Sequence, residues 1–212
     1  FIFSKKNGLI KSFSKFKNKQ LQSVMLLDKV SFEWQSKDRD SLGFIKITSE
    51  KSYKSKDFFC SLIKSSASEL CLKFLPLWEE NIAIFNNLEK LIDQCKGDIS
   101  EVILNYVWWE ILFLKNTGYG LNLNECVVTG SKENLYFISP RTGNCVSYEI
   151  GKQYSKKLFK IPQCIKNKKI PKNFSDFLDA LKITSYFLKK NFNYDLSKLV
   201  FRNHLMKNLT HL

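Results

Sequence analysis

The sequence predicts an α+β protein in which a small N-terminal β domain precedes an α-helical bundle. Partly alternating runs of Val, Ile, Leu and Phe fill residues 1–50, and apolar residues recur at helical spacing from residue 57 onwards. Five of the chain's eight glycines lie between Gly118 and Gly151, as expected for a compact set of turns. We therefore expect domains at 1–52 and 53–212, with a small β-hairpin insert at 117–151.

The N-terminal domain should consist of three or four short strands. The predicted strands are Leu9–Phe13, Val24–Trp34 and Leu42–Thr48. The pair Asn7-Gly8 is a strong hairpin signal, and Asp38–Ser41 is a polar loop. So few strands cannot close a barrel by themselves.

Helical patterns follow, and prolines, glycines and capping residues separate them. Pro76 ends the first helix, and Gly97 followed by Asp98 divides the second from the third. The third helix is apolar almost all round, which is typical of a central buried helix. The predicted helices are Asp57–Phe74, Leu77–Cys95, Ile99–Lys115, Ser175–Asn191 and Asp195–Asn208.

The insert is predicted from two apolar runs, Leu135–Ile138 and Cys145–Tyr148, that a Pro- and Gly-containing turn joins. The stretch Lys152–Lys172 that follows contains eight lysines and no acid, and we interpret it as a loop or short helix.

The net charge of +14, with 34 Lys and Arg against 20 Asp and Glu, favours an anionic partner. Nucleic acid is the first candidate and a membrane surface the second. The alternative is that a lysine-rich genome makes many surfaces basic without function. Six cysteines contain no C-x-x-C pair, and neither a signal peptide nor a membrane-spanning run is present, so we expect a cytoplasmic protein with reduced thiols.

Catalysis is disfavoured by the sequence. The histidines, His204 and His211, both lie near the C-terminus, and no P-loop, H-E-x-x-H or G-x-S-x-G motif is present. Glu110 is an acid on the predicted central helix, and a lone buried glutamate is more often a hydrogen-bonded structural group than a base. We therefore expect no enzymatic activity.

Residues 118–130 (GYGLNLNECVVTG) and 135–149 (LYFISPRTGNCVSYE) resemble the RecO family of bacterial DNA-repair proteins. The segments YVWWEIL at 106–112 and DFLDALKITSYFL at 176–188 fit the same family. The resemblance implies an incomplete OB-fold-like β-barrel at the N-terminus, with its first strands upstream of Phe1. It also implies a helical C-terminal domain with a zinc-ribbon-like insert.

Zinc in this family is often held by four cysteines in two C-x-x-C pairs. Here Cys126 is followed three residues later by Thr129, and Cys145 stands alone. Structural zinc needs four soft ligands, so we expect no metal or other cofactor.

DNA binding is expected at the N-terminus, where lysines and phenylalanines interleave over twenty residues without an acid. Lysine contacts phosphate without reading sequence, and aromatic rings can stack on bases. The resemblance places the basic DNA-binding loop at Lys15, Lys17 and Lys19. The candidate residues are Lys5, Lys6, Lys11, Lys15, Phe16, Lys17 and Lys19, and a second basic stretch comprises Lys156, Lys157, Lys166, Lys168 and Lys169.

The resemblance also implies two protein partners, which are RecR and the acidic tail of single-stranded-DNA-binding protein. A tail pocket needs an apolar floor and a cationic rim. Candidates are Lys64, Lys73, Trp108 and Lys115, although relatives often carry Arg at the position of Trp108.

Together these features predict a non-catalytic mediator of recombination at the cytoplasmic nucleoid. It would bind single- and double-stranded DNA, anneal complementary strands and help load recombinase onto single-stranded DNA. The alternatives are an adaptor that binds single-stranded-DNA-binding protein or RecR with little DNA affinity, and an RNA-binding OB protein.

Overall fold

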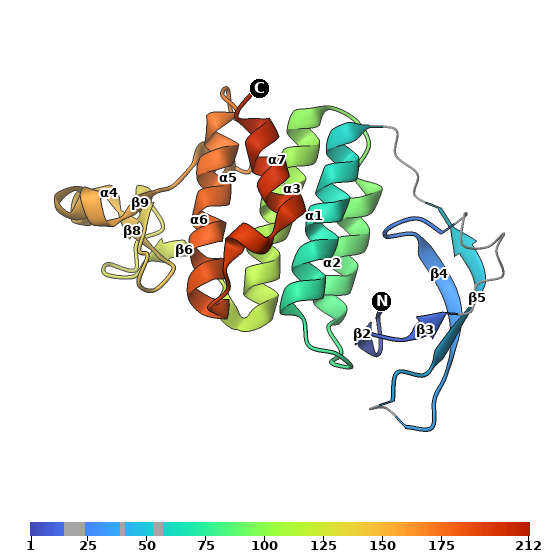
Figure 1. The fold of residues 1–212 in the computed structure, drawn as a ribbon. Coiled ribbons are helices and arrows are strands. Elements are labelled where there is room, and N and C mark those ends of the chain that lie inside the picture. The colour runs from blue at the N-terminus through green and yellow to red at the C-terminus, as the bar shows by residue number, and fades with distance from the viewer. Residues whose placement is uncertain (15–23, 39–40, 53–56) are drawn as a thin grey trace. The chain divides into compact units, whose positions relative to one another are not determined.

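A computed structural model describes residues 1–14, 24–38, 41–52 and 57–212, and they form two compact units, Phe1–Cys95 and Lys96–Leu212. Each unit contains both helices and strands (Figure 1), so the predicted α+β class is confirmed. The first compact unit contains two helices as well as the N-terminal strands. The domain boundary expected after residue 52 stays a prediction. None of the described helices is long and apolar enough to cross a membrane.

Short strands form two sheets in the first unit. β1 and β2 pair as an antiparallel hairpin, and the central strand β5 pairs with β3 in parallel and with β4 antiparallel. Within the described residues neither sheet closes into a barrel. The strands are β1 (Ile2–Ser4), β2 (Gly8–Ile10), β3 (Phe13–Ser14), β4 (Lys29–Gln35) and β5 (Phe44–Lys51).

The second predicted strand is shorter than expected. Residues 24–28 form a turn, in which the Met25 and Asp28 backbones are hydrogen bonded and the Asp28 carboxylate accepts the Met25 N–H at 2.7 Å. Leu27 has a φ of 62°, which a strand does not allow. The apolar residues Val24–Leu27 resemble a strand in sequence, but the structure folds them into a turn. This part of the predicted strand is therefore wrong.

Helices α1 (Phe58–Phe74) and α2 (Ile82–Asp93) complete the first unit. The carboxylate of Asp57 caps α1 by accepting the Cys60 N–H at 2.7 Å. Asn81 caps α2 in the same way, so α2 begins at Ile82 and not at Leu77 as predicted. Residues 77–81 form a connection, which the Trp78 N–H ties to the Leu9 carbonyl at 3.0 Å.

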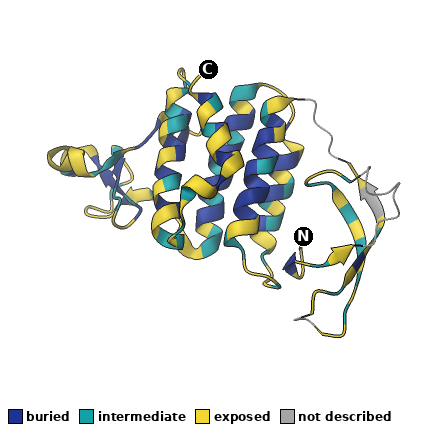
Figure 2. Ribbon diagram, in the orientation of Figure 1, coloured by how far each residue is buried: buried dark blue, intermediate teal, exposed yellow. Residues whose placement is uncertain are grey.

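Three helices form the frame of the second unit, and α3 is its buried centre as predicted (Figures 1 and 2). The last predicted helix is divided at Leu199, where a short 3-10 turn ends. The helices are α3 (Ile99–Leu114), α6 (Ser175–Phe192) and α7 (Val200–Leu209), with the turns η1 (Lys115–Tyr119) and η3 (Leu196–Lys198).

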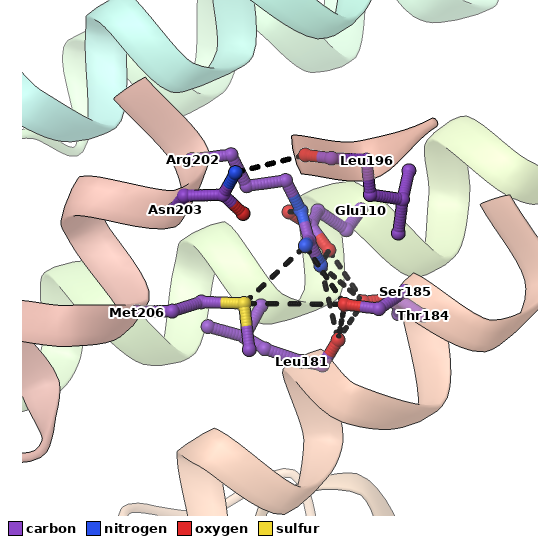
Figure 3. A network of polar contacts seen from close by, with 8 residues as sticks. All are labelled: Glu110, Leu181, Thr184, Ser185, Leu196, Arg202, Asn203 and Met206. Atoms are coloured by element: carbon purple, nitrogen blue, oxygen red, sulfur yellow. Dashed lines mark hydrogen bonds and ion pairs between the residues drawn. The ribbon is translucent and has the colours of Figure 1, made fainter. Parts of the chain in front are cut away.

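A buried ion pair joins α3 to α7 (Figure 3). The guanidinium of Arg202 donates from Nε and Nη2 to the two oxygens of Glu110 at 2.8 and 2.9 Å, and both side chains are 1% exposed. Burial by itself lowers the pKa of Arg202, but the charge and hydrogen bonds of Glu110 outweigh it, and the pKa is raised. The expectation that Glu110 is a hydrogen-bonded structural group is confirmed.

Helix α6 supplies further partners of this pair, and the Met206 sulfur on α7 accepts from Arg202 at 3.3 Å. The Thr184 hydroxyl donates to Glu110, and Arg202 donates to the Leu181 carbonyl at 3.0 Å and to the Ser185 hydroxyl at 2.8 Å. Both buried charges therefore have hydrogen-bond partners besides each other, which offsets part of the cost of burying an ion pair. The network fixes α3, α6 and α7 to one another.

The insert between α3 and α6 is a sheet of four strands in the order β6-β8-β7-β9, larger than the predicted hairpin. The predicted hairpin is present as the antiparallel pair β7 and β8, which a turn from Ser139 to Gly143 joins. β6 adds in parallel to β8, and β9 adds to the other edge. The strands are β6 (Asn122–Cys126), β7 (Leu135–Ile138), β8 (Asn144–Ser147) and β9 (Phe159–Lys160).

Breaking the Arg202–Glu110 pair should destabilise the second unit severely. Arg202→Met leaves the Glu110 carboxylate buried without its cation, so we expect a loss of about 3–5 kcal/mol in the free energy of unfolding. Chemical denaturation followed by circular dichroism measures this loss.

The exposed pair Lys182–Asp179 provides the control. Lys182→Met should cost under about 1 kcal/mol. The double variant Glu110→Leu/Arg202→Met should cost less than the sum of its single variants, because it leaves no lone buried charge. Equal losses for Arg202→Met and Lys182→Met would contradict the assigned role.

Candidate nucleic-acid interface

The described N-terminal lysines lie on the surface of the first unit. Lys5 and Lys6 are exposed in the turn between β1 and β2, and Lys11 is exposed just after β2. The other members of the predicted site, Lys15, Phe16, Lys17 and Lys19, lie outside the described residues. The described part is compatible with phosphate contacts, and the full N-terminal site stays a prediction.

Two exposed aromatic rings lie on the neighbouring strands, and the first of them follows Lys11 by two residues. Phe13 on β3 is 58% exposed and Phe44 on β5 is 51% exposed, and their ring centroids are 6.1 Å apart. Phe13 is therefore a surface residue and does not fill the core. Sequence reasoning missed Phe44, because its partner across the parallel β3–β5 pair is thirty-one residues away.

The second basic stretch is built on a short helix that α6 holds in place. The carboxylate of Asp176, in the first turn of α6, accepts the backbone N–H groups of Gln163 and Cys164 at 2.8 and 2.7 Å. These residues begin α5 (Gln163–Lys166). The indole N–H of Trp108 donates to the Cys164 carbonyl at 3.2 Å, so α3 holds the same turn.

Two lysines of this stretch, Lys166 and Lys168, and the nearby Lys160 make cation–π contacts with aromatic rings of two other segments. The Nζ atoms of Lys160 and Lys166 lie 5.4 and 5.7 Å from the ring centre of Tyr136 on β7, and the Nζ of Lys168 lies 4.5 Å from the ring of Trp108. Such cation–π contacts hold a lysine near a fixed position. Lys156, Lys157 and Lys169 are also exposed.

The candidates for the partner pocket fall into different environments. Lys64 on α1 is 7% exposed, so it is not a cation at a surface rim. Lys73 in the last turn of α1 and Lys115 at the end of α3 are exposed. Trp108 lies beside the second basic stretch, because Lys168 lies over its ring and its indole N–H donates to the Cys164 carbonyl. The pocket itself stays a prediction.

The residues around Cys126 do not fit a zinc site. Cys126 and Cys145 are backbone partners on β6 and β8, but hydroxyl groups of Thr129 and Ser147 are the other side chains that contact the Cys126 thiol. Tetrahedral structural zinc takes four thiolate or imidazole ligands. No group of three or more potential metal ligands occurs among the described residues.

The Cys126 thiol makes hydrogen bonds with neighbouring side-chain and backbone groups. Burial raises the pKa of this thiol, but bonds from the Thr129 hydroxyl and from the N–H groups of Ser147, Thr129 and Val128 outweigh that effect and lower it to about 6. The Ser147 N–H lies 3.3 Å from the sulfur. The turn therefore folds around a sulfur atom that several donors contact.

A family model and two curated proteins that match this sequence point to the same family. Residues 55–198 match the family model described as Recombination protein O C terminal. The chain is 34% identical over 197 residues to the DNA repair protein RecO of Wolbachia pipientis wMel, covering 89% of this chain and 82% of that protein. It is 32% identical over 203 residues to the DNA repair protein RecO of Ehrlichia chaffeensis, covering 90% and 81%. No solved structure gives a significant match.

The Cys126 thiolate should make stability depend on pH. Between the folded pKa of about 6 and the ordinary value of 9.0, the unfolded chain binds a proton that the folded chain has released. Stability should therefore rise with pH across this interval, by up to about 1.4 kcal/mol per pH unit, and fall as pH drops toward 6.

Thermal unfolding of the native protein and Cys126→Ser at several pH values between 6 and 9 measures this effect. Cys126→Ser should lose that part of the pH dependence. Cys71→Ser is the matched control, because burial raises the pKa of Cys71 to about 12 and its proton stays bound across the interval. Parallel pH profiles for the native protein and Cys126→Ser would show that the thiol does not ionise in the folded state.

Proposed function

The chain belongs to the RecO family of DNA repair proteins, and on that premise we propose that it is a mediator of recombinational repair that binds DNA without chemical catalysis. It holds single- and double-stranded DNA, anneals complementary strands and helps recombinase load onto single-stranded DNA. The observation that carries this proposal is the family similarity over 89% of the chain. We expect it to act at the cytoplasmic nucleoid.

The charge distribution supports this proposal. Lys5, Lys6 and Lys11 are exposed on the first unit, and the second basic stretch is exposed on the second unit. Lysine–phosphate contacts release counterions and lower the repulsion between two strands. Bases that lie unstacked on such a surface can then pair with a complementary strand, so annealing needs no bond to be made or broken in the protein.

The buried acid does not support an enzymatic alternative. A general base must reach the proton that it removes, and Glu110 is 1% exposed and occupied by Arg202 and Thr184. The mediator function therefore depends on binding surfaces and on partner proteins.

Protein partners complete the proposed function. The exposed cations Lys73 and Lys115 are the accessible members of the set proposed to attract the acidic tail of single-stranded-DNA-binding protein. The N-terminal unit is proposed to contact RecR, with its strands forming part of an OB-fold-like domain. Both interactions would bring the DNA-bound protein to coated single strands.

Salt dependence and annealing test the proposal together. Fluorescence anisotropy of a labelled single-stranded oligonucleotide should show that affinity falls roughly a hundredfold or more between about 50 and 200 mM salt. Under the lower salt condition, the protein should accelerate the pairing of two complementary oligonucleotides that carry a donor and an acceptor dye.

Charge reversal at the N-terminal loop provides the variant arm. Lys15→Glu/Lys17→Glu/Lys19→Glu should weaken DNA binding by roughly a hundredfold or more, while Lys182→Glu/Lys198→Glu/Lys207→Glu makes the same charge change on other surfaces and should weaken it far less. Circular dichroism checks that both variants fold. Absence of DNA binding and annealing by the native protein, with partner binding retained, would replace the mediator by an adaptor.

A further inference from the structure

The outer end of the insert carries alternating exposed tyrosines and lysines. It consists of α4 (Tyr148–Gly151) and the 3-10 turn η2 (Lys152–Lys157), which follow one another without a break. Tyr148 is 48% exposed and Tyr154 is 53% exposed, while Lys152, Lys156 and Lys157 are exposed between and beyond them. We call these five residues the Tyr–Lys ridge. Figure 2 shows this part of the insert as exposed.

Close packing against β7 holds the ridge in place. Gly151 packs so closely on β7 that a Cβ atom would lie 2.3 Å from the Phe137 ring. The Tyr148 ring lies nearly parallel to Phe137, at 12° and 6.4 Å, and edge-on to Tyr136 at 5.2 Å. The Tyr148 N–H donates to the Asn134 carbonyl at 2.9 Å. These contacts therefore fix the orientation of the Tyr148 ring, while about half of the surface of Tyr148 stays exposed to solvent.

The segment from residue 134 to residue 175, which contains the ridge and is flanked by Glu133 and Asp176, is strongly basic in sequence. Glu149 is the only acid from residue 134 to residue 175, a range that contains eight lysines and Arg141. Over the part of the chain that the structure describes, no ion pair engages Lys152, Lys156 or Lys157. A solvated charged face in an ordinary domain usually mixes both signs. This composition instead favours a polyanion.

We propose that the Tyr–Lys ridge is a binding site for single-stranded DNA, separate from the N-terminal lysines. Lys152, Lys156 and Lys157 contact phosphates, and the rings of Tyr148 and Tyr154 stack on bases, which is a sequence-tolerant form of recognition. Tyr154 lies six positions after Tyr148, or about 9–12 Å along a helical axis, so the two rings serve different bases of one strand.

This inference deepens the proposed function and rests on it in taking DNA as the partner. Duplex DNA hides its base faces, so exposed rings add affinity only for a single strand. One chain then carries a basic aromatic surface on each unit. Two surfaces can hold two strands at once, which would raise the local concentration of one strand near the other.

Two kinds of variant separate the two contacts. In anisotropy titrations with a labelled oligothymidylate, Lys152→Gln/Lys156→Gln/Lys157→Gln should reduce the slope of log affinity against log salt by about 2. Tyr148→Ala/Tyr154→Ala should lower affinity roughly tenfold or more at every salt concentration and leave the slope unchanged. Tyr148→Phe/Tyr154→Phe keeps both rings and should restore binding.

The control variant Lys182→Gln/Lys198→Gln/Lys207→Gln makes the same charge change elsewhere on the second unit and should leave the slope nearly unchanged. The affinity of the tyrosine variant for a duplex of the same length should also remain unchanged. Tight binding by the native protein with no change in any ridge variant overturns this inference and leaves the proposed function standing. No binding by the native protein overturns both.

A third readout excludes another anionic partner. Exposed tyrosines and lysines can also adsorb to an anionic membrane surface. If the ridge variants lose binding to phosphatidylserine vesicles but keep full affinity for the oligothymidylate, the site is a membrane contact and the inference is wrong. Loss of DNA affinity in the same variants supports the inference.

Discussion

The buried pair of Arg202 and Glu110 is the constraint on which the second unit depends. It joins α7 to α3, and the Thr184 and Ser185 hydroxyls and the Leu181 carbonyl add α6 to the same network. Removing two charges from water is costly, and only a complete set of partners offsets that cost. Because the insert leaves the end of α3 and returns to the start of α6, the network also fixes the two points from which the Tyr–Lys ridge projects.

Packing and hydrogen bonds hold the insert together. Cys126, Phe137 and Val146 form a small core, against which Leu135, Tyr136, Ile150 and Leu158 pack. The Cys126 sulfur accepts the Ser147 N–H at 3.3 Å. The Lys190 ammonium on α6 donates to the Pro140 and Arg141 carbonyls in the β7–β8 turn at 3.0 and 2.6 Å. These contacts therefore hold the insert together and tie it to α6.

Local patterns made the helices predictable, whereas contacts between distant segments were not. The period of apolar residues located α1, α3 and α6, and the capping residue Asp98 located the start of α3. β6 was missed because Asn122–Cys126 is mostly polar and becomes a strand only by pairing with β8. Arg202 was missed because an arginine on an amphipathic helix reads as a surface residue. Trp108 and Lys168 were assigned to different sites, although the fold brings them together.

Hydrogen–deuterium exchange of the whole protein, with and without a saturating single-stranded oligonucleotide, tests most directly that two separate surfaces bind DNA. We predict slower exchange in two regions, residues 1–20 and residues 148–169, and unchanged exchange in α7. Protection of the N-terminal region alone would leave one DNA surface. Protection of neither region, under conditions in which the oligonucleotide is bound, would contradict the account.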